Sequence, residues 1–156
     1  MLKYFWPFLA IVIISGVVKI SIATYRLKRL KDAGMPEIDQ MDGKEFEQYL
    51  EILFKKLGFK VKRTPYTGDF GGDLVLEKDS VKTVVQAKRY KKNVGNKAVQ
   101  EVVAAKAYYK AQAALIVTNS NFTSAAMQLA KANNVELWGR EKLVKAILET
   151  KKEKSS

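Results

Sequence analysis

Apolar residues recur at helical spacing in one part of the chain, between residues 42 and 57. The apolar positions there are Phe46, Leu50, Leu53, Phe54 and Leu57. Such spacing is typical of a helix with one face packed on a core. Asp42 and Glu45 stand at the spacing of a capping box, which favours a helix beginning between them. The pattern therefore predicts an amphipathic helix.

Short runs rich in valine, leucine and threonine predict strands elsewhere. Residues 74–77 and 81–87 flank Lys78-Asp79-Ser80, whose residue types favour a turn, so we expect a β-hairpin. Further strands are predicted at residues 59–64, 113–118 and 135–138, and further helices at residues 97–110, 124–132 and 140–149. Strands alternating with helices predict an α/β fold with a central mixed β-sheet flanked by helices.

The N-terminal segment has a different pattern. Residues 4–25 are apolar apart from Lys19 and a few hydroxyl-bearing residues, and a basic cluster begins at Arg26. This predicts one transmembrane helix, a single-pass location in the inner or cell membrane, and a cytoplasmic C-terminal domain. A signal peptide, with Phe5–Val18 as its apolar region, is the alternative. The predicted division is residues 1–31 as helix and basic flank, 32–41 as linker, 42–149 as the folded domain and 150–156 as a charged tail.

Composition narrows the chemistry. The 156 residues contain neither cysteine nor histidine, which excludes disulfides and leaves carboxylates, amides and lysine as site groups. The formal charge of +12 favours a polyanionic partner, either nucleic acid or anionic lipid, although a basic surface can also serve solubility alone.

Candidate site chemistry lies on the predicted hairpin. Gln86 and Lys88 point the same way because alternate residues of a strand share a face. Asp73 opens the partner strand, so its carboxylate is expected near both. Carboxylate and amide oxygens suit Mg²⁺ or Mn²⁺, and a neighbouring lysine can orient water and offset phosphate charge.

These residues carry a family resemblance. Residues 69–73, Asp-Phe-Gly-Gly-Asp, followed by Gln86-Ala87-Lys88, resemble the metal-binding core of the PD-(D/E)XK nucleases, and more narrowly the catalytic domain of Mrr-like restriction endonucleases. The likeness extends over about residues 41–148 through Gly43–Glu47, Leu57–Phe59, Val117–Asn119 and Leu137–Gly139.

The resemblance implies a restriction-endonuclease-like fold and a divalent-metal-dependent DNA endonuclease, which the predicted N-terminal helix would anchor to a membrane. It makes Asp73, Gln86, the Ala87 carbonyl and Glu47 the expected metal ligands, with Lys88 positioning the attacking water; an ordinary solvated helix acid is the alternative for Glu47. Gln86 departs from the acid found in most of the wider superfamily but is usual in Mrr-like domains. A neutral amide lowers metal affinity unless Glu47 or Asp69 compensates.

Expected DNA contacts surround this site. Arg89, Lys91 and Lys92 form a basic run beyond Lys88 that suits phosphates, Tyr66 would border the cleft, and Gln100 resembles in place a family glutamine facing the site. A solvated loop and an exposed helix position are the alternatives for the basic run and for Gln100.

Two other functions remain open: a non-catalytic DNA-binding module tethered to the membrane, and docking of the basic domain on anionic lipid. The target sequence, dependence on methylation and oligomeric state also remain open, with a homodimer as one alternative.

Overall fold

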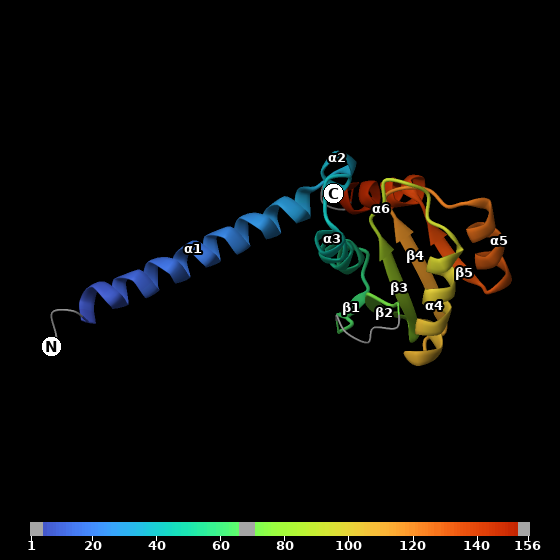
Figure 1. The fold of residues 1–156 in the computed structure, drawn as a ribbon, viewed down its shortest axis with the longest axis horizontal. Coiled ribbons are helices and arrows are strands. Elements are labelled where there is room, and N and C mark those ends of the chain that lie inside the picture. Colours follow the sequence, from blue (N-terminus) through green and yellow to red (C-terminus); the bar gives the residue numbers. More distant parts are fainter. Residues whose placement is uncertain (1–4, 66–70, 153–156) are drawn as a thin grey trace. The chain divides into compact units, whose positions relative to one another are not determined.

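The chain divides into two units, Met1–Asp32 and Ala33–Ser156. The computed structural model describes residues 5–65 and 71–152. In the first unit a single helix, α1 (Phe5–Asp32), occupies the described residues. The second unit contains the sheet and the other described helices (Figure 1).

The predicted membrane location is wrong. Among the described parts of the chain, the structure contains no helix with both the length and the apolar character that crossing a bilayer requires. The apolar part of α1 includes the charge of Lys19. The finding replaces the expected single-pass anchor in the inner or cell membrane and the cytoplasmic placement that followed from it.

A mixed five-stranded sheet forms the centre of the second unit, as the sequence pattern predicts. The strands are β1 (Lys60–Arg63), β2 (Leu74–Lys78), β3 (Val81–Lys88), β4 (Ala113–Thr118) and β5 (Val135–Trp138), and they lie in this order across the sheet. The pairs β1–β2 and β2–β3 are antiparallel, whereas β3–β4 and β4–β5 are parallel.

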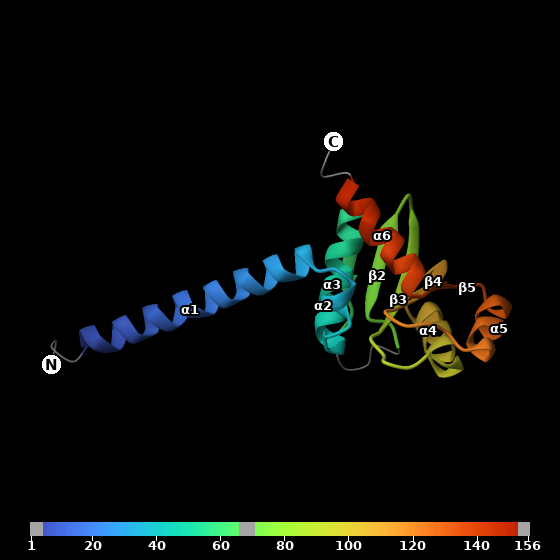
Figure 2. The same ribbon diagram turned by 90° about the horizontal axis from the view of Figure 1, so that it is seen from above.

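Helices cover both faces of this sheet. They are α2 (Met35–Ile38), α3 (Gly43–Lys56), α4 (Asn96–Tyr108), α5 (Ser124–Ala132) and α6 (Arg140–Lys152). The pair α3 and α6 lies on one face and the pair α4 and α5 on the other (Figure 2). The parallel connections from β3 to β4 and from β4 to β5 run through α4 and α5, as crossover connections between parallel strands require.

The β2–β3 hairpin is the predicted one. Leu74 pairs with Val85 and Lys78 with Val81. The chain reverses at Asp79 and Ser80, which have φ angles of 51° and 64°. Positive φ at both central residues is the geometry of a tight turn that matches strand twist. This register fixes which residues of β3 stand beside the start of β2.

Local signals also place α3 correctly. The backbone N–H of Glu45 donates to Asp42 Oδ1 at 2.8 Å, and the N–H of Asp42 donates to Glu45 Oε2 at 3.2 Å, so the predicted capping box is present. The helix ends before Gly58, whose φ of 83° is the left-handed conformation that commonly stops a helix. Phe46, Leu50 and Phe54 are fully buried beneath it.

The segment predicted as a linker is packed rather than extended. It holds the short helix α2 and buries Ala33, Ile38 and Met41 almost completely. Pro36 lies in the first turn of α2, where a missing N–H costs nothing. A helix this short carries too few positions to reveal an amphipathic period, which is why the sequence pattern missed it.

Gly72 lies where the start of β2 meets α4, and a substitution there should destabilise the domain. A Cβ at Gly72 would stand 2.6 Å from Val84 Cγ2 and 3.2 Å from both Ala105 Cβ and a ring atom of Tyr109. We expect Gly72→Ala to lower the free energy of unfolding by roughly 1–3 kcal/mol, the usual cost of overpacking a core, as measured by denaturant unfolding.

Gly43→Ala is the matched control, because a Cβ at Gly43 meets nothing within 4 Å. It lies in the first turn of α3, and alanine has the higher helix propensity. Its free energy of unfolding should be unchanged or slightly raised. Equal stability of the two variants would contradict the close packing described at Gly72.

Candidate active site

The start of β2 is bound to the end of β3 through Asp73. The Asp73 N–H donates to the Val85 carbonyl at 2.8 Å, and Asp73 Oδ2 accepts a hydrogen bond from the Ala87 N–H at 2.7 Å. The carboxylate is thereby held at the residue between Gln86 and Lys88, where the sequence places it.

Gln86 and Lys88 lie on the same face of β3, as predicted, and both reach one side chain of α4. Gln86 Nε2 donates to Glu101 Oε2 at 2.7 Å, and Lys88 Nζ donates to the same oxygen at 2.9 Å. The Gln86 side chain is buried, with 2% of the residue exposed. Its Oε1 atom is buried without a hydrogen-bond partner.

Glu101 is the residue that sequence reasoning missed. Gln100, the expected member of this helix, is exposed. Glu101 stands three residues after Ala98 and four before Ala105, both of which are buried against the sheet. Positions three and four apart share a helix face, so this spacing was the signal that could have found it.

The two donors decide the charge state of Glu101. Partial burial by itself would raise the pKa of this carboxyl group, but the hydrogen bonds from Lys88 and Gln86 and the nearby positive charges outweigh burial and lower the pKa below its usual value. Glu101 is therefore an anion at neutral pH and forms an ion pair with Lys88.

The chain before Asp73 comes into direct contact with Glu101. Gly71 has φ of 84°, and a Cβ built on it would stand 2.7 Å from Glu101 Cβ and 3.1 Å from the Glu101 carbonyl carbon. Only glycine fits such an approach without displacement. The loop that delivers Asp73 to the sheet and the helix that carries Glu101 therefore meet at this point.

The donor set suits a hard divalent cation. Asp73 and Glu101 offer carboxylate oxygens, and the buried, unpartnered Gln86 Oε1 is an acceptor that a cation would satisfy. Among the described residues no group of three or more Asp, Glu, His or Cys side chains could hold a metal ion. Any site here therefore depends on the amide as well as on acids.

The remaining predicted residues lie around this cluster or outside the described chain. Glu47 lies half-buried on α3, and its membership of the site stays a prediction, as does a ligand role for the Ala87 carbonyl. Tyr66 falls outside the described residues. Lys91 and Lys92 are exposed in the loop after β3.

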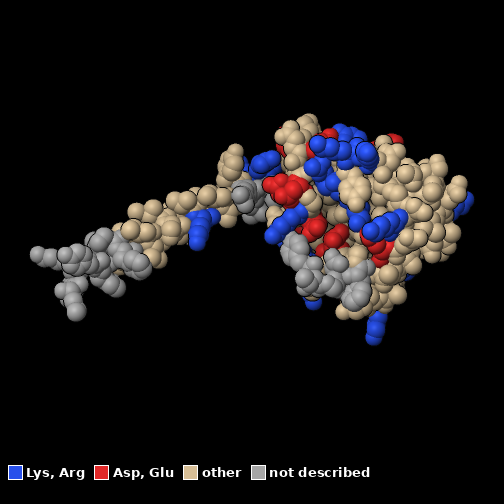
Figure 3. All heavy atoms as spheres, in the orientation of Figure 1, with Lys and Arg blue, Asp and Glu red and all other residues tan. Residues whose placement is uncertain are grey.

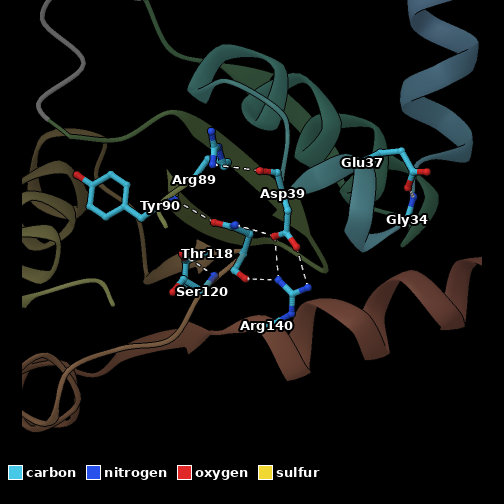
Figure 4. A network of polar contacts seen from close by, with 9 residues as sticks. Gly34, Glu37, Asp39, Arg89, Tyr90, Thr118, Ser120 and Arg140 are labelled. Atoms are coloured by element: carbon cyan, nitrogen blue, oxygen red, sulfur yellow. Dashed lines mark hydrogen bonds and ion pairs between the residues drawn. The ribbon is translucent and has the colours of Figure 1, made fainter. Parts of the chain in front are cut away.

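Arg89 takes part in an internal network rather than standing free in the loop (Figure 4). Its Nη1 atom donates to the Asp39 carbonyl at 3.2 Å. The Asp39 carboxylate accepts two hydrogen bonds of 2.8 Å from Arg140 and one of 2.9 Å from Asn119. Asn119 Oδ1 in turn accepts from the Tyr90 N–H at 2.9 Å. The network fixes the two residues that directly follow Lys88.

One face of the second unit carries many charged side chains. Lysine and arginine side chains gather on the face that Figure 3 shows, with acidic side chains between them. A basic surface attracts a polyanion and raises its association rate.

Comparisons with known proteins identify relatives of this chain. Residues 38–147 match the family model Mrr_cat, described as restriction endonuclease. The chain is 32% identical over 136 residues to the type IV methyl-directed restriction enzyme EcoKMrr of Escherichia coli strain K12, covering 79% of this chain and 45% of that protein. The chain thus spans about half the length of this curated relative.

Two solved structures share the fold. One is the protein of unknown function AF1548, with a TM-score of 0.57, 20% identity, and 67% of this chain and 64% of that chain covered. The other is the DNA modification-dependent restriction endonuclease AspBHI, with a TM-score of 0.57, 19% identity, and 76% and 35% covered. The α/β fold is therefore restriction-endonuclease-like.

Removing Arg140 tests the network around Asp39. The hydrogen bonds from Arg140 are the largest influence on the pKa of Asp39, which lies below its usual value of 3.8. The ionised carboxylate therefore stabilises the fold above that pH, and this stability is lost as the pH falls through the lowered pKa. We expect Arg140→Met to lower Tm at neutral pH and the difference from the unsubstituted protein to narrow below about pH 4.

Lys142→Met is the matched control, since it removes an exposed cation from the same helix, 3.4 Å from Glu136. Thermal melting from pH 2 to pH 7 should show a much smaller loss. An Arg140→Met deficit that stays constant over this range would contradict the assignment.

Proposed function

The chain belongs to the Mrr_cat family of restriction endonucleases, and on that premise we propose that its folded domain is a DNA endonuclease that hydrolyses phosphodiester bonds with Mg²⁺ or Mn²⁺ as cofactor. The observation that carries the proposal is the meeting of Asp73, Gln86 and Lys88 at the neighbouring ends of β2 and β3. No other cluster among the described residues combines a carboxylate, a buried unpartnered amide oxygen and a lysine.

The proposal gives each residue a role. Asp73 and Gln86 would hold the cation, with the Ala87 carbonyl and Glu47 as further ligands. A divalent cation in this position polarises the scissile phosphate and offsets charge on the leaving oxygen. The Lys88 side chain is only 20% exposed and donates a hydrogen bond to Glu101, which suits the ammonium group to orient the attacking water beside the phosphate.

DNA is the proposed substrate, and exposed basic residues beside the site would hold its backbone. Lys91 and Lys92 supply phosphate contacts in this proposal, together with Tyr66 and Gln100 near the cleft. Arg89 contributes less to DNA than the sequence suggests, because its guanidinium group already donates to Asp39. Its role in the proposal is to hold the loop that presents the two lysines.

Whether cleavage depends on methylation of the DNA is left to the experiment. The Escherichia coli relative is named as methyl-directed and AspBHI as modification-dependent. This chain covers 45% of the former and 35% of the latter. The cleavage assay therefore uses methylated and unmethylated duplexes side by side.

A non-catalytic DNA-binding module is the second candidate. The neutral Gln86 and the lack of a three-acid cluster among the described residues favour it, because both weaken metal binding. Salt-sensitive DNA binding without cleavage under Mg²⁺ or Mn²⁺ would select this candidate over the endonuclease.

Substitution of the central residues should abolish cleavage. We expect Asp73→Asn and Lys88→Met each to reduce the rate of plasmid nicking by about 10²-fold or more, because each removes a group acting on the reacting phosphate. Lys131→Met, which removes an exposed lysine of α5, should cleave like the unsubstituted protein. Undiminished nicking by both site variants would exclude Asp73 and Lys88 from the mechanism.

The basic loop should account for part of the salt dependence of DNA binding. A Lys91→Ala/Lys92→Ala variant removes two cations that would each neutralise one phosphate, so the slope of log Kobs against log salt concentration should become shallower by about 1.8. Fluorescence anisotropy with a labelled duplex at several salt concentrations measures this slope. The control, Lys151→Ala/Lys152→Ala at the end of α6, removes the same charge, and an equal change in its slope would show a non-specific charge effect.

A further inference from the structure

We propose that Glu101 is an anionic metal ligand of the site and supplies the charge that Gln86 lacks. The inference rests on the proposed metal-dependent function, and it assigns the ligand to α4 instead of β3. Four observations support it, each independent of the family resemblance.

The first observation is a deficit of charge. A divalent cation bound by protein groups alone generally has carboxylate ligands, and an amide brings no compensating charge. In the described part of the site, β3 contributes the amide of Gln86, and the segment that opens β2 contributes the carboxylate of Asp73. Asp73 is therefore the single carboxylate that these two strand ends supply. A further acid must therefore come from another element, either from α3, where Glu47 is the proposed ligand, or from α4.

The second observation is the position of Glu101. Its Oε2 atom lies 2.7 Å from Gln86 Nε2 and 2.9 Å from Lys88 Nζ, so its carboxylate stands between the two side chains of β3 that face α4. Its Oε1 atom forms a longer ion pair of 3.9 Å with Lys97 Nζ, and the Lys97 side chain is 88% exposed. A cation that binds this oxygen would displace a solvent-exposed lysine and not a buried partner.

The third observation is the orphaned amide oxygen. Gln86 has an exposed fraction of only 2%, and its Oε1 has no hydrogen-bond partner. Leaving a buried acceptor unsatisfied destabilises the folded state. The planar amide places this oxygen next to the nitrogen that binds Glu101, so a cation reached by both the amide and Glu101 would remove the deficit.

The fourth observation is the approach of Gly71. The 2.7 Å separation between its built Cβ and Glu101 Cβ places the chain two residues before Asp73 against the base of the Glu101 side chain. The segment that leads into Asp73 therefore packs against the part of α4 that carries Glu101. A lysine-positioning role alone would explain the bond to Lys88 but neither the orphaned oxygen nor the burial of Gln86 beside the carboxylate.

The test is Mn²⁺ binding by the full chain without DNA, measured by isothermal titration calorimetry. Glu101→Gln keeps the shape and both hydrogen-bond partners but removes the charge, and should weaken Mn²⁺ binding by about tenfold or more. Glu101→Gln/Gln86→Glu, which moves the carboxylate to β3, should recover most of that affinity. Recovery by relocation is the result that a merely structural Glu101 would not give.

Glu136→Gln is the matched control. Glu136 also accepts from two donors, Trp138 Nε1 and Lys142 Nζ, but it lies on β5, two strands away from β3 in the sheet. Its substitution should leave Mn²⁺ affinity unchanged. Equal Mn²⁺ affinity of Glu101→Gln and the unsubstituted protein overturns the inference, as does failure of the relocated carboxylate to restore binding.

Glu101→Gln leaves Lys88 without its anionic partner and could for that reason melt below the assay temperature. In that case Lys88→Met is compared with Lys88→Met/Glu101→Gln, because both of these variants lack the lysine and differ only in the charge at position 101. The double variant should again bind Mn²⁺ more weakly, and equal affinities would overturn the inference. The test of Glu101 as a metal ligand can fail or succeed independently of the test of the endonuclease function. Mn²⁺ binding that depends on Glu101 without DNA cleavage rejects the endonuclease and keeps the ligand, whereas cleavage with Glu101-independent binding does the reverse.

Discussion

The site depends first on the pairing register of β2 and β3. The turn at Asp79 and Ser80 sets Leu74 opposite Val85, and the Asp73 carboxylate then reaches the Ala87 N–H. Alternate side chains of a strand point to opposite faces, so a slip by one residue would turn Gln86 and Lys88 away from α4. A short turn at one end of the hairpin thus controls the chemistry at the other.

A small number of polar and charged side chains at the end of β3 determine the charge state of the site. A buried amide and a partly buried lysine share one oxygen of Glu101, and their hydrogen bonds keep this carboxyl group ionised despite its burial. A buried charge is tolerated when paired and costly when not. The same arrangement holds Lys88 in a defined direction, since a long flexible side chain is otherwise free to sample many rotamers.

The end of β3 is held from the opposite direction by a second polar network. Asp39, which follows α2, binds Arg140 of α6 and Asn119, while Arg89 donates to its backbone. These elements come from widely separated parts of the chain, with Asp39 and Arg140 101 residues apart. The loop that follows Lys88 is therefore part of the folded framework, and Arg89, which reads as a DNA-binding side chain in the sequence, serves this framework.

Local patterns were enough to predict the capping box at Asp42, the hairpin, the buried strand β4 and the alignment of Asp73 with Gln86 and Lys88, because each depends on neighbours in sequence or on one tight turn. The predicted membrane helix is not found among the described parts of the chain. Glu101, the packed segment around α2 and the internal use of Arg89 were decided by tertiary structure. Each of these results from contact between elements far apart in the chain, and no periodic pattern within one segment encodes which partner another segment will provide.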